Sequence, residues 1–192
     1  PSVKPARGGP GERAFQGGLG PKKVDVSYAD ERHGLLLAVS VKTICFPPYG
    51  KNLKNRFGDL CTEAITLHMR FPYAVVGALF AMPEEADEDT TLQRRTSTFQ
   101  RARMLLGTIS GRTDYASPGE KFEDVTMMLF RPLGIDEAGP QVRLFSATTH
   151  SGGSGEVTGL QYFERLRDLY NIRNPHVQIG LGLNGADDEG AE

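Results

Sequence analysis

The chain is poor in the residues that build disulfide scaffolds and zinc ribbons. It has two cysteines in 192 residues, Cys45 and Cys61. Two thiols without a C-x-x-C spacing argue against both structures and favour a reduced, cytoplasmic setting. No run approaches the roughly 18 apolar residues of a membrane-spanning helix, and no charged-then-apolar signal segment opens the chain. We therefore expect a cytoplasmic protein without a membrane segment. Because residue 1 is proline, we also expect the chain shown to lack its natural start.

Charge of one sign is not in excess either. The chain has 22 basic and 24 acidic residues, which gives a formal net charge of -2. Proteins that coat nucleic acid are usually strongly basic. A metal-dependent nuclease, however, gathers carboxylates at its centre and basic groups at its rim. The overall charge therefore decides nothing about a nucleic-acid partner.

Length and composition are sufficient for one hydrophobic core. Apolar residues make up 39% of the chain, as in soluble globular domains. Residues 1–23 are rich in Gly, Pro and basic residues, which predicts a flexible lead-in with a short helical piece at 12–16. Residues 185–192 are small and acidic and are expected to be disordered. A single domain is predicted over residues 24–184.

Hydrophobic periodicity within this domain predicts alternating strands and helices. Strands are predicted at 24–28, 35–44, 73–82, 124–130 and 142–147. Helices are predicted at 52–70, 91–107 and 156–170, with an acidic loop at 84–89 and a Gly-rich connector at 151–155. The order β-β-α-β-α-β-β-α indicates an α/β fold, a mixed central sheet flanked by helices.

Acidic and basic side chains on the first three of these elements form a candidate site. Asp25 lies on the first strand, and Ser40 and Lys42 share one face of the second, because strand side chains alternate. Asp59 and Glu63 are four residues apart on one helix face. A lysine at the end of an apolar strand is rarely buried without a partner. Carboxylate oxygens suit hard cations such as Mg²⁺, which activate water, and a nearby lysine can offset developing negative charge.

These residues resemble the PD-(D/E)xK pattern of restriction-endonuclease-like enzymes. The matching segments are Lys23-Val-Asp25-Val-Ser and Leu36-Leu-Ala-Val-Ser-Val-Lys42-Thr, and the resemblance covers roughly residues 22–82. In that superfamily an Asp on one strand and an acid-x-Lys on the next bind metal ions. Ser40 stands where the second acid is expected. In a branch that cuts CCGG-containing sites the acid has moved to a Thr-Glu-Ala sequence on the next helix, which Thr62-Glu63-Ala64 resembles.

The resemblance implies a restriction-endonuclease-like nuclease domain that hydrolyses DNA as a Mg²⁺-dependent endonuclease, with Mn²⁺ as a substitute. The implied metal ligands are Asp25, Glu63, its rival Asp59 and the Val41 carbonyl. Lys42 would orient or activate the attacking water, and Ser40 would fill the position of the missing acid. Glu12 is a further candidate, because a leading-helix Glu approaches the metals in some relatives. Restriction-type members often dimerise, so a homodimer is an expectation as well.

Basic and amide side chains at the start of the helix predicted at 52–70 are the candidate DNA contacts. We expect them at the mouth of the site, where the cut strand passes Lys42; they are Lys51, Asn52, Lys54, Asn55 and Arg56. A second basic group is interpreted as a solvated helix face that neutralises the acidic loop, with phosphate contact as the alternative. Its members are Arg94, Arg95, Arg101, Arg103 and Arg112.

Two other functions remain open at this point. A nuclease-like domain with its site decayed at Ser40 would bind DNA or a protein without cutting. An RNA or structure-specific nuclease would use the same metals. The four histidines have no metal-ligand spacing, and His68 is expected to pack or cap. No Ser-His-Asp or Cys-His arrangement can be assembled, so hydrolysis through a covalent intermediate has no support.

Overall fold

A computed structural model describes residues 13–30, 32–131, 142–148, 155–176 and 178. Its main feature is a six-stranded mixed sheet in the order β3-β4-β5-β6-β7-β8. The strands are β3 (Val26–Asp30), β4 (Gly34–Thr43), β5 (Val75–Pro83), β6 (Asp124–Phe130), β7 (Val142–Ser146) and β8 (Glu156–Val157). The predicted fold class, α/β with a mixed central sheet flanked by helices, is confirmed. The finer likeness to the restriction-endonuclease fold stays a prediction.

The centre of the sheet is parallel and its edges are antiparallel. β4 pairs in parallel with β5, and β5 with β6, whereas β3, β7 and β8 pair antiparallel. β5 is buried along nearly its whole length, because helices cover the sheet on both faces. At Gly77 the covering is so close that a Cβ atom would lie 2.7 Å from Leu166 and from the Tyr162 hydroxyl.

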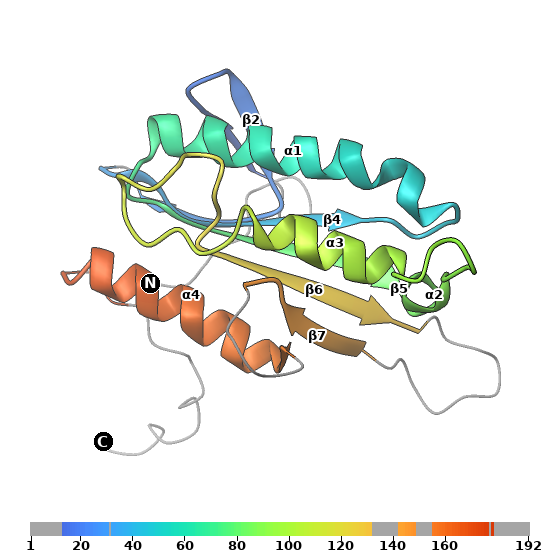
Figure 1. The fold of residues 1–192 in the computed structure, drawn as a ribbon. Helices are drawn as coiled ribbons and strands as arrows, with labels where there is room; N and C mark the ends of the chain where they lie inside the picture. Colours follow the sequence, from blue (N-terminus) through green and yellow to red (C-terminus); the bar gives the residue numbers. More distant parts are fainter. Residues whose placement is uncertain (1–12, 31, 132–141, 149–154, 177, 179–192) are drawn as a thin grey trace, which may run out of the picture.

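Helices form the outer two layers. α1 (Tyr49–Arg70) and α3 (Thr98–Gly107) lie over one face, and α4 (Gly159–Arg173) lies over the other (Figure 1). Ala38 of β4 belongs to the core on the α1 side, whereas Val39 belongs to the core on the α4 side. Side chains alternate along a strand, so Ser40 and Lys42 point to the α1 face.

A separate two-stranded hairpin packs on α1 and corrects the prediction of a flexible lead-in through residue 23. Its strands are β1 (Arg13–Gln16) and β2 (Pro21–Val24), so the helical piece expected at 12–16 is a strand over its described part. Phe15 is buried against Phe71, with ring centroids 6.2 Å apart. The Gly18 N–H donates to the Thr66 carbonyl of α1 at 2.8 Å. Buried apolar anchors thus order a segment whose Gly and Pro content had indicated flexibility. Residues 1–12 and 185–192 lie outside the described ranges.

Two predicted boundaries and one predicted loop are wrong. α3 begins at Thr98 rather than residue 91, because the Ser97 hydroxyl caps it by accepting from the Gln100 N–H. α4 begins at Gly159 with a Thr158–Gln161 capping box, after the unpredicted strand β8. The acidic segment 84–89 contains a short helix, α2 (Glu85–Glu88).

None of the helices in the described ranges has the length and apolar character needed to cross a bilayer.

Candidate active site

Lys42, near the end of β4, lies between two carboxylates. Its Nζ atom is 3.0 Å from Glu63 Oε2 and 3.9 Å from Asp25 Oδ2. The same ammonium group donates a hydrogen bond to Ser40 Oγ at 2.8 Å. The structure therefore brings together four of the residues that the sequence singled out, from β4, from α1 and from the segment before β3.

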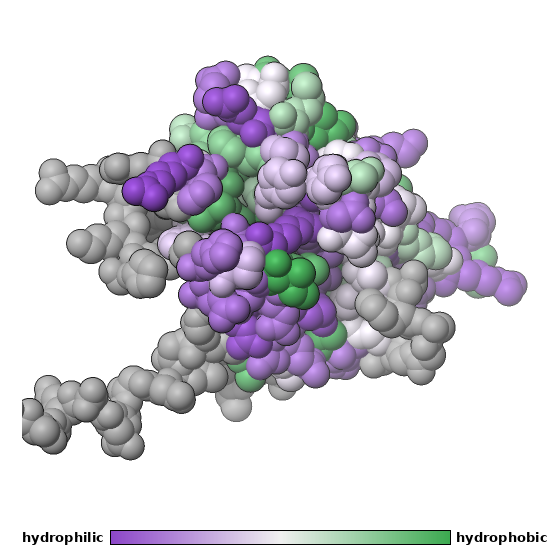
Figure 2. Space-filling model, turned by 90° about the vertical axis from the view of Figure 1, so that its left-hand side faces the viewer, coloured by the Kyte–Doolittle hydropathy of each residue, from purple (hydrophilic) through white to green (hydrophobic). Residues whose placement is uncertain are grey.

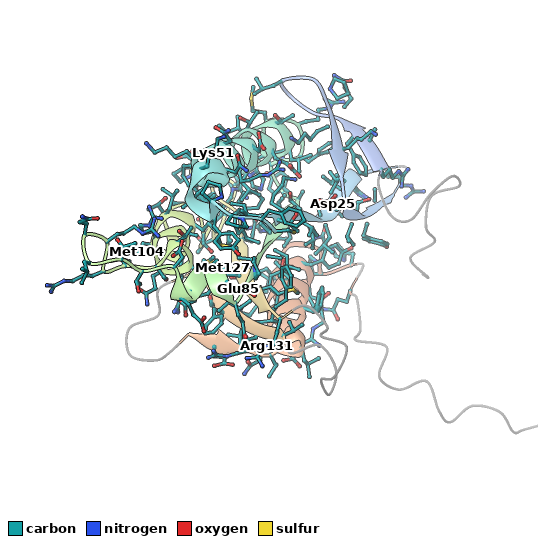
Figure 3. All side chains as sticks on the ribbon, turned by 90° about the vertical axis from the view of Figure 1, so that its right-hand side faces the viewer. Asp25, Lys51, Glu85, Met104, Met127 and Arg131 are labelled. Atoms are coloured by element: carbon teal, nitrogen blue, oxygen red, sulfur yellow. The ribbon has the colours of Figure 1, made fainter. Side chains whose placement is uncertain are left out.

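Asp25 is held at the end of the β3–β4 ladder. That ladder ends at the Val26–Val39 pair, so Val41 lies beyond it. The Val41 N–H instead donates to Asp25 Oδ2 at 2.6 Å. The N–H and C=O of one strand residue point to the same side, so the Val41 carbonyl faces this edge as well. Figure 3 shows Asp25 at the base of the β1–β2 hairpin.

The chain breaks its extended run at Asp25, and this break corrects a prediction. The sequence predicted one strand over 24–28, whereas β2 ends at Val24 and β3 begins at Val26. Residues before the break pair within the hairpin, and residues after it join the main sheet. Apolar and polar residues alternate without interruption through Asp25. The pattern therefore does not indicate that the strand pairs with β1 before Asp25 and with β4 after it.

Glu63 presents a fully buried carboxylate to this cluster. Its side chain has 0% exposure, and Oε2 contacts Lys42 and also Lys22 Nζ of β2, at 3.3 Å. Neither Oε1 nor Oε2 has a hydrogen-bond partner among the described residues, although Oε2 lies in the two ion pairs. Burying a carboxylate oxygen without a partner is costly, so a cation at Oε1 would stabilise it.

Lys22 is the site residue that sequence analysis missed. It lies two residues before Val24, which is 1% exposed, so both side chains point from the same face of β2. This alternation is the sequence signal that places Lys22 on the buried face of β2. A segment that is expected to be flexible has no such face, so the signal could not be used.

Asp59, the rival of Glu63, lies elsewhere. Its side chain is 51% exposed and pairs with Arg56 Nη1 at 3.3 Å. Four helical residues advance the direction by about 40° and the position by ~6 Å along the axis. That offset separates the two acids, although their spacing had placed them on one face.

The donor set fits a hard dication. No three His, Cys, Asp or Glu side chains gather into a ligand group in the part of the chain that the structure describes. Mg²⁺ does not need three, because it is often bound through one or two carboxylates and keeps several waters. Asp25 and Glu63 bring two carboxylates to within 3.9 Å of Lys42 Nζ, and Glu63 Oε1 is buried without a hydrogen-bond partner among the described residues.

The candidate DNA contacts lie farther from this site than expected. Lys51, Asn52, Lys54, Asn55 and Arg56 are all exposed. However, twelve residues of α1 separate Lys51 from Glu63, or ~18 Å. Figure 3 shows Lys51 well away from Asp25. The segment 44–48, with Pro47 and Pro48, carries the chain past the end of β4 before α1 begins.

The arginines after the acidic segment serve different contacts. Arg94 pairs with Asp89 at 3.2 Å, which agrees with neutralisation of the acidic segment. Arg101 donates to Thr98 Oγ1 and, with Lys51 and Arg94, lines a cavity of about 420 Å³ at the start of α1. Arg103 donates to the Ser146 carbonyl, and Arg95 is exposed.

Arg112 is 2% exposed, so its assignment to a solvated face is wrong. Glu12 lies outside the described residues.

Arg112 belongs to a buried cluster around Glu123. Glu123 Oε1 accepts from Arg112 at 2.8 Å and from Arg173 at 2.6 Å, and Oε2 lies 3.4 Å from His68 Nε2. Burial alone would raise the pKa of Glu123, but His68, Arg173 and the Val76 N–H outweigh it and lower that pKa below its ordinary value. This cluster joins α1, β5 and α4 through the residue that precedes β6, and His68 is packed within it, as expected.

A cavity of about 520 Å³ lies at the opposite end of β4 from Lys42. Its lining includes Leu35, Phe71 and Ala74, where β4 and β5 begin and α1 ends. Figure 2 shows this end of the molecule, where hydrophilic and hydrophobic side chains are interspersed. The cavity is thus separate from the carboxylate–lysine cluster, where Lys42 and Asp25 are partly exposed.

Comparison of the chain with protein-family models, with curated proteins and with solved structures gives no match. Among the described groups, the cluster around Lys42 combines two acids, two ammonium groups and an unsatisfied buried oxygen.

Proposed function

We propose that this protein is a Mg²⁺-dependent DNA endonuclease of restriction-enzyme type that hydrolyses phosphodiester bonds. The observation that carries the proposal is the meeting of Asp25, Lys42 and Glu63, with the lysine within 3.9 Å of both acids. The buried and unpartnered Glu63 Oε1 supports a cation at this position.

Each side chain has a role in the proposed reaction. Asp25 and Glu63 hold the cation, with the Val41 carbonyl as a further ligand. When bound, Mg²⁺ supplies an activated water and charge neutralisation at the phosphate. Lys42 orients the attacking water and offsets the negative charge that develops on the phosphate. Ser40, which is 1% exposed, accepts a hydrogen bond from Lys42 and fixes its ammonium group in the place of a second strand acid.

The start of α1 supports DNA as the substrate. Its first two turns carry Lys51, Lys54 and Arg56, and its first turn has no acidic residue. The free N–H groups and the dipole of a helix N-terminus attract phosphate. The ~18 Å between Lys51 and Glu63 corresponds to about five base pairs of duplex at 3.4 Å each. One duplex can therefore contact both regions.

Nicking of supercoiled plasmid DNA tests the proposal. The wild type is expected to nick and linearise the plasmid with Mg²⁺ or Mn²⁺ and to stop when EDTA removes the metal. Lys42→Ala should lower the rate by roughly 100- to 1000-fold, while circular dichroism confirms that it is folded. Structured and single-stranded RNA are assayed in parallel. A wild type that never cuts DNA with either metal overturns the proposal: RNA cleavage would then indicate an RNA nuclease, and DNA binding alone a non-cutting module.

A further inference from the structure

Two ammonium groups share one oxygen of a buried carboxylate. Lys42 Nζ is 3.0 Å and Lys22 Nζ is 3.3 Å from Glu63 Oε2. The carboxylate has 0% exposure, whereas the lysine side chains are 18% and 28% exposed. A buried charge is tolerated only when it is paired. The two lysines thus supply the pairing that Glu63 has in this structure.

A dication that binds Glu63 must compete with these ammonium groups. Asp25, Glu63, Lys22 and Lys42 together carry no net charge, so the cluster is balanced before any metal binds. Adding a divalent ion places two further positive charges beside the lysines. The cation and the ammonium groups would be bound to the same carboxylate and would repel each other, most strongly where water is excluded. A cation at Oε1 and two ammonium groups at Oε2 of the same carboxylate therefore oppose one another, and the departure of one ammonium group relieves this repulsion.

Lys22 is better placed to leave than Lys42. Lys42 also donates to Ser40 Oγ and lies 3.9 Å from Asp25. It stands on β4, which pairs with β3 and β5 in the main sheet. Lys22 is the more exposed of the two and stands on a two-stranded hairpin outside that sheet. A two-stranded hairpin has little stability of its own, so its side chains move at lower cost.

We propose that Lys22 neutralises Glu63 in the metal-free protein and is displaced when the dication binds, so that it sets the metal affinity of the site. Lys22 is a positioning residue, because it acts through Glu63. This inference rests on the proposed metal-dependent function and adds a regulator of metal loading to it.

Metal binding without DNA tests the inference, with Mn²⁺ titrated into wild type, Lys22→Ala and Lys23→Ala by calorimetry. Lys23→Ala is the matched control, because it removes the same charge from the next residue of β2, whose side chain points to the opposite face. Lys22→Ala is expected to bind Mn²⁺ about three- to fivefold more tightly than the wild type, in keeping with loss of one partly exposed ion pair. Lys23→Ala should stay within about twofold of the wild type.

Thermal unfolding gives a second readout. Lys22→Ala should have a lower Tm than the wild type without metal, because Glu63 loses a partner. Mn²⁺ should then raise its Tm by more than it raises the wild-type Tm. Lys22→Gln keeps most of the apolar stem and serves if the alanine variant fails to fold. Lys22→Arg keeps the charge and should restore the wild-type affinity.

Different results overturn the inference and the proposed function. If the wild type cuts DNA and binds Mn²⁺, but both Lys22→Ala and Lys22→Gln bind no more tightly than Lys23→Ala, Lys22 has only a structural role. If the wild type neither binds Mn²⁺ nor cuts DNA, the metal site itself is wrong and the inference fails with it. A Tm lowered equally with and without Mn²⁺ also contradicts displacement.

Discussion

Asp25 accepts a hydrogen bond from the backbone N–H of Val41 at 2.6 Å, in the place where the backbone of a longer β3 would have paired with β4. One carboxylate thus completes a strand edge and stands beside the Lys42 ammonium group. The candidate site lies where β4 extends beyond the end of β3 and its backbone has no strand partner on that side. The Asp25 carboxylate accepts the hydrogen bond that a backbone carbonyl would otherwise accept.

Replacing Asp25 separates these two duties. Asp25→Asn keeps an oxygen that can accept from Val41 but loses the charge, so its free energy of unfolding should stay within about 1 kcal/mol of the wild type. Its DNA cleavage should fall by about 100-fold or more, because a neutral amide is a weak ligand for Mg²⁺. Asp25→Ala should lose both cleavage and stability, the latter by roughly 1.5–3 kcal/mol. Urea unfolding and plasmid nicking measure the two effects. Equal stability of the two variants would show that the Val41 contact contributes nothing.

Ser40→Ala tests how the Lys42 ammonium group is held. The variant removes a hydroxyl that accepts from Lys42 at 2.8 Å and leaves both acids in place. Cleavage is expected to fall about tenfold through kcat, while the Mn²⁺ affinity stays close to that of the wild type. Single-turnover kinetics and calorimetry give the two numbers. A large loss of metal affinity at unchanged kcat would instead place Ser40 among the ligands.

The β1–β2 hairpin can be displaced without touching a charged residue. A Cβ atom on Gly18 would lie 2.4 Å from Met69 Cβ of α1, so Gly18→Ala should push the hairpin from the helix. We expect faster proteolysis at residues 13–24 and a loss of roughly 1–3 kcal/mol. Gly58→Ala is the control on α1, since nothing lies within 4 Å of its Cβ. It should stabilise the protein by about 0.5–1 kcal/mol. Equal proteolysis of the two variants would contradict hairpin docking.

The buried Glu123 cluster predicts acid sensitivity away from the site. The pKa of Glu123 lies below its ordinary value of 4.5, so the unfolded chain takes up its proton first as the pH falls. Its contribution to stability is therefore complete above the unfolded pKa and is lost as the pH falls through the folded pKa. Glu123→Gln should cost roughly 3–5 kcal/mol at pH 7 and should flatten the pH dependence of stability as the pH falls below the ordinary value of 4.5. Asp168→Asn, an exposed acid paired with Arg167, is the control for urea unfolding. An unchanged slope in Glu123→Gln would contradict the assignment.

Periodicity along the chain was sufficient for much of the fold. β6 spans the residues that were predicted, and the cores of β4, β5 and α1 lie where the apolar residues recur. These are long, well-buried segments. The boundary of α3 was wrong because residues 91–107 carry helix-like spacing, whereas a cap at Ser97 decides where the helix begins.

The candidate site was accessible from sequence only where its residues share a local pattern. Ser40 and Lys42 follow from strand alternation, and Asp25 and Glu63 from their resemblance to a known motif; the structure brings the four together. Strand alternation could indicate only which face Lys22 shares with Val24, because its contact with Glu63 depends on a hairpin docking against a helix some forty residues later in the chain. The choice between Asp59 and Glu63 likewise required the orientation of α1 relative to the sheet.

The central claim is tested most directly by a matched pair of variants on α1, Glu63→Gln and Asp59→Asn, in plasmid nicking at saturating Mg²⁺. Each variant removes one carboxylate charge from the same helix and keeps the side-chain shape. Glu63→Gln is expected to lose about 100-fold or more of the rate, whereas Asp59→Asn should remain within about twofold of the wild type, because that acid is 51% exposed and paired with Arg56. Undiminished cleavage by Glu63→Gln, with or without a loss in Asp59→Asn, would contradict the site.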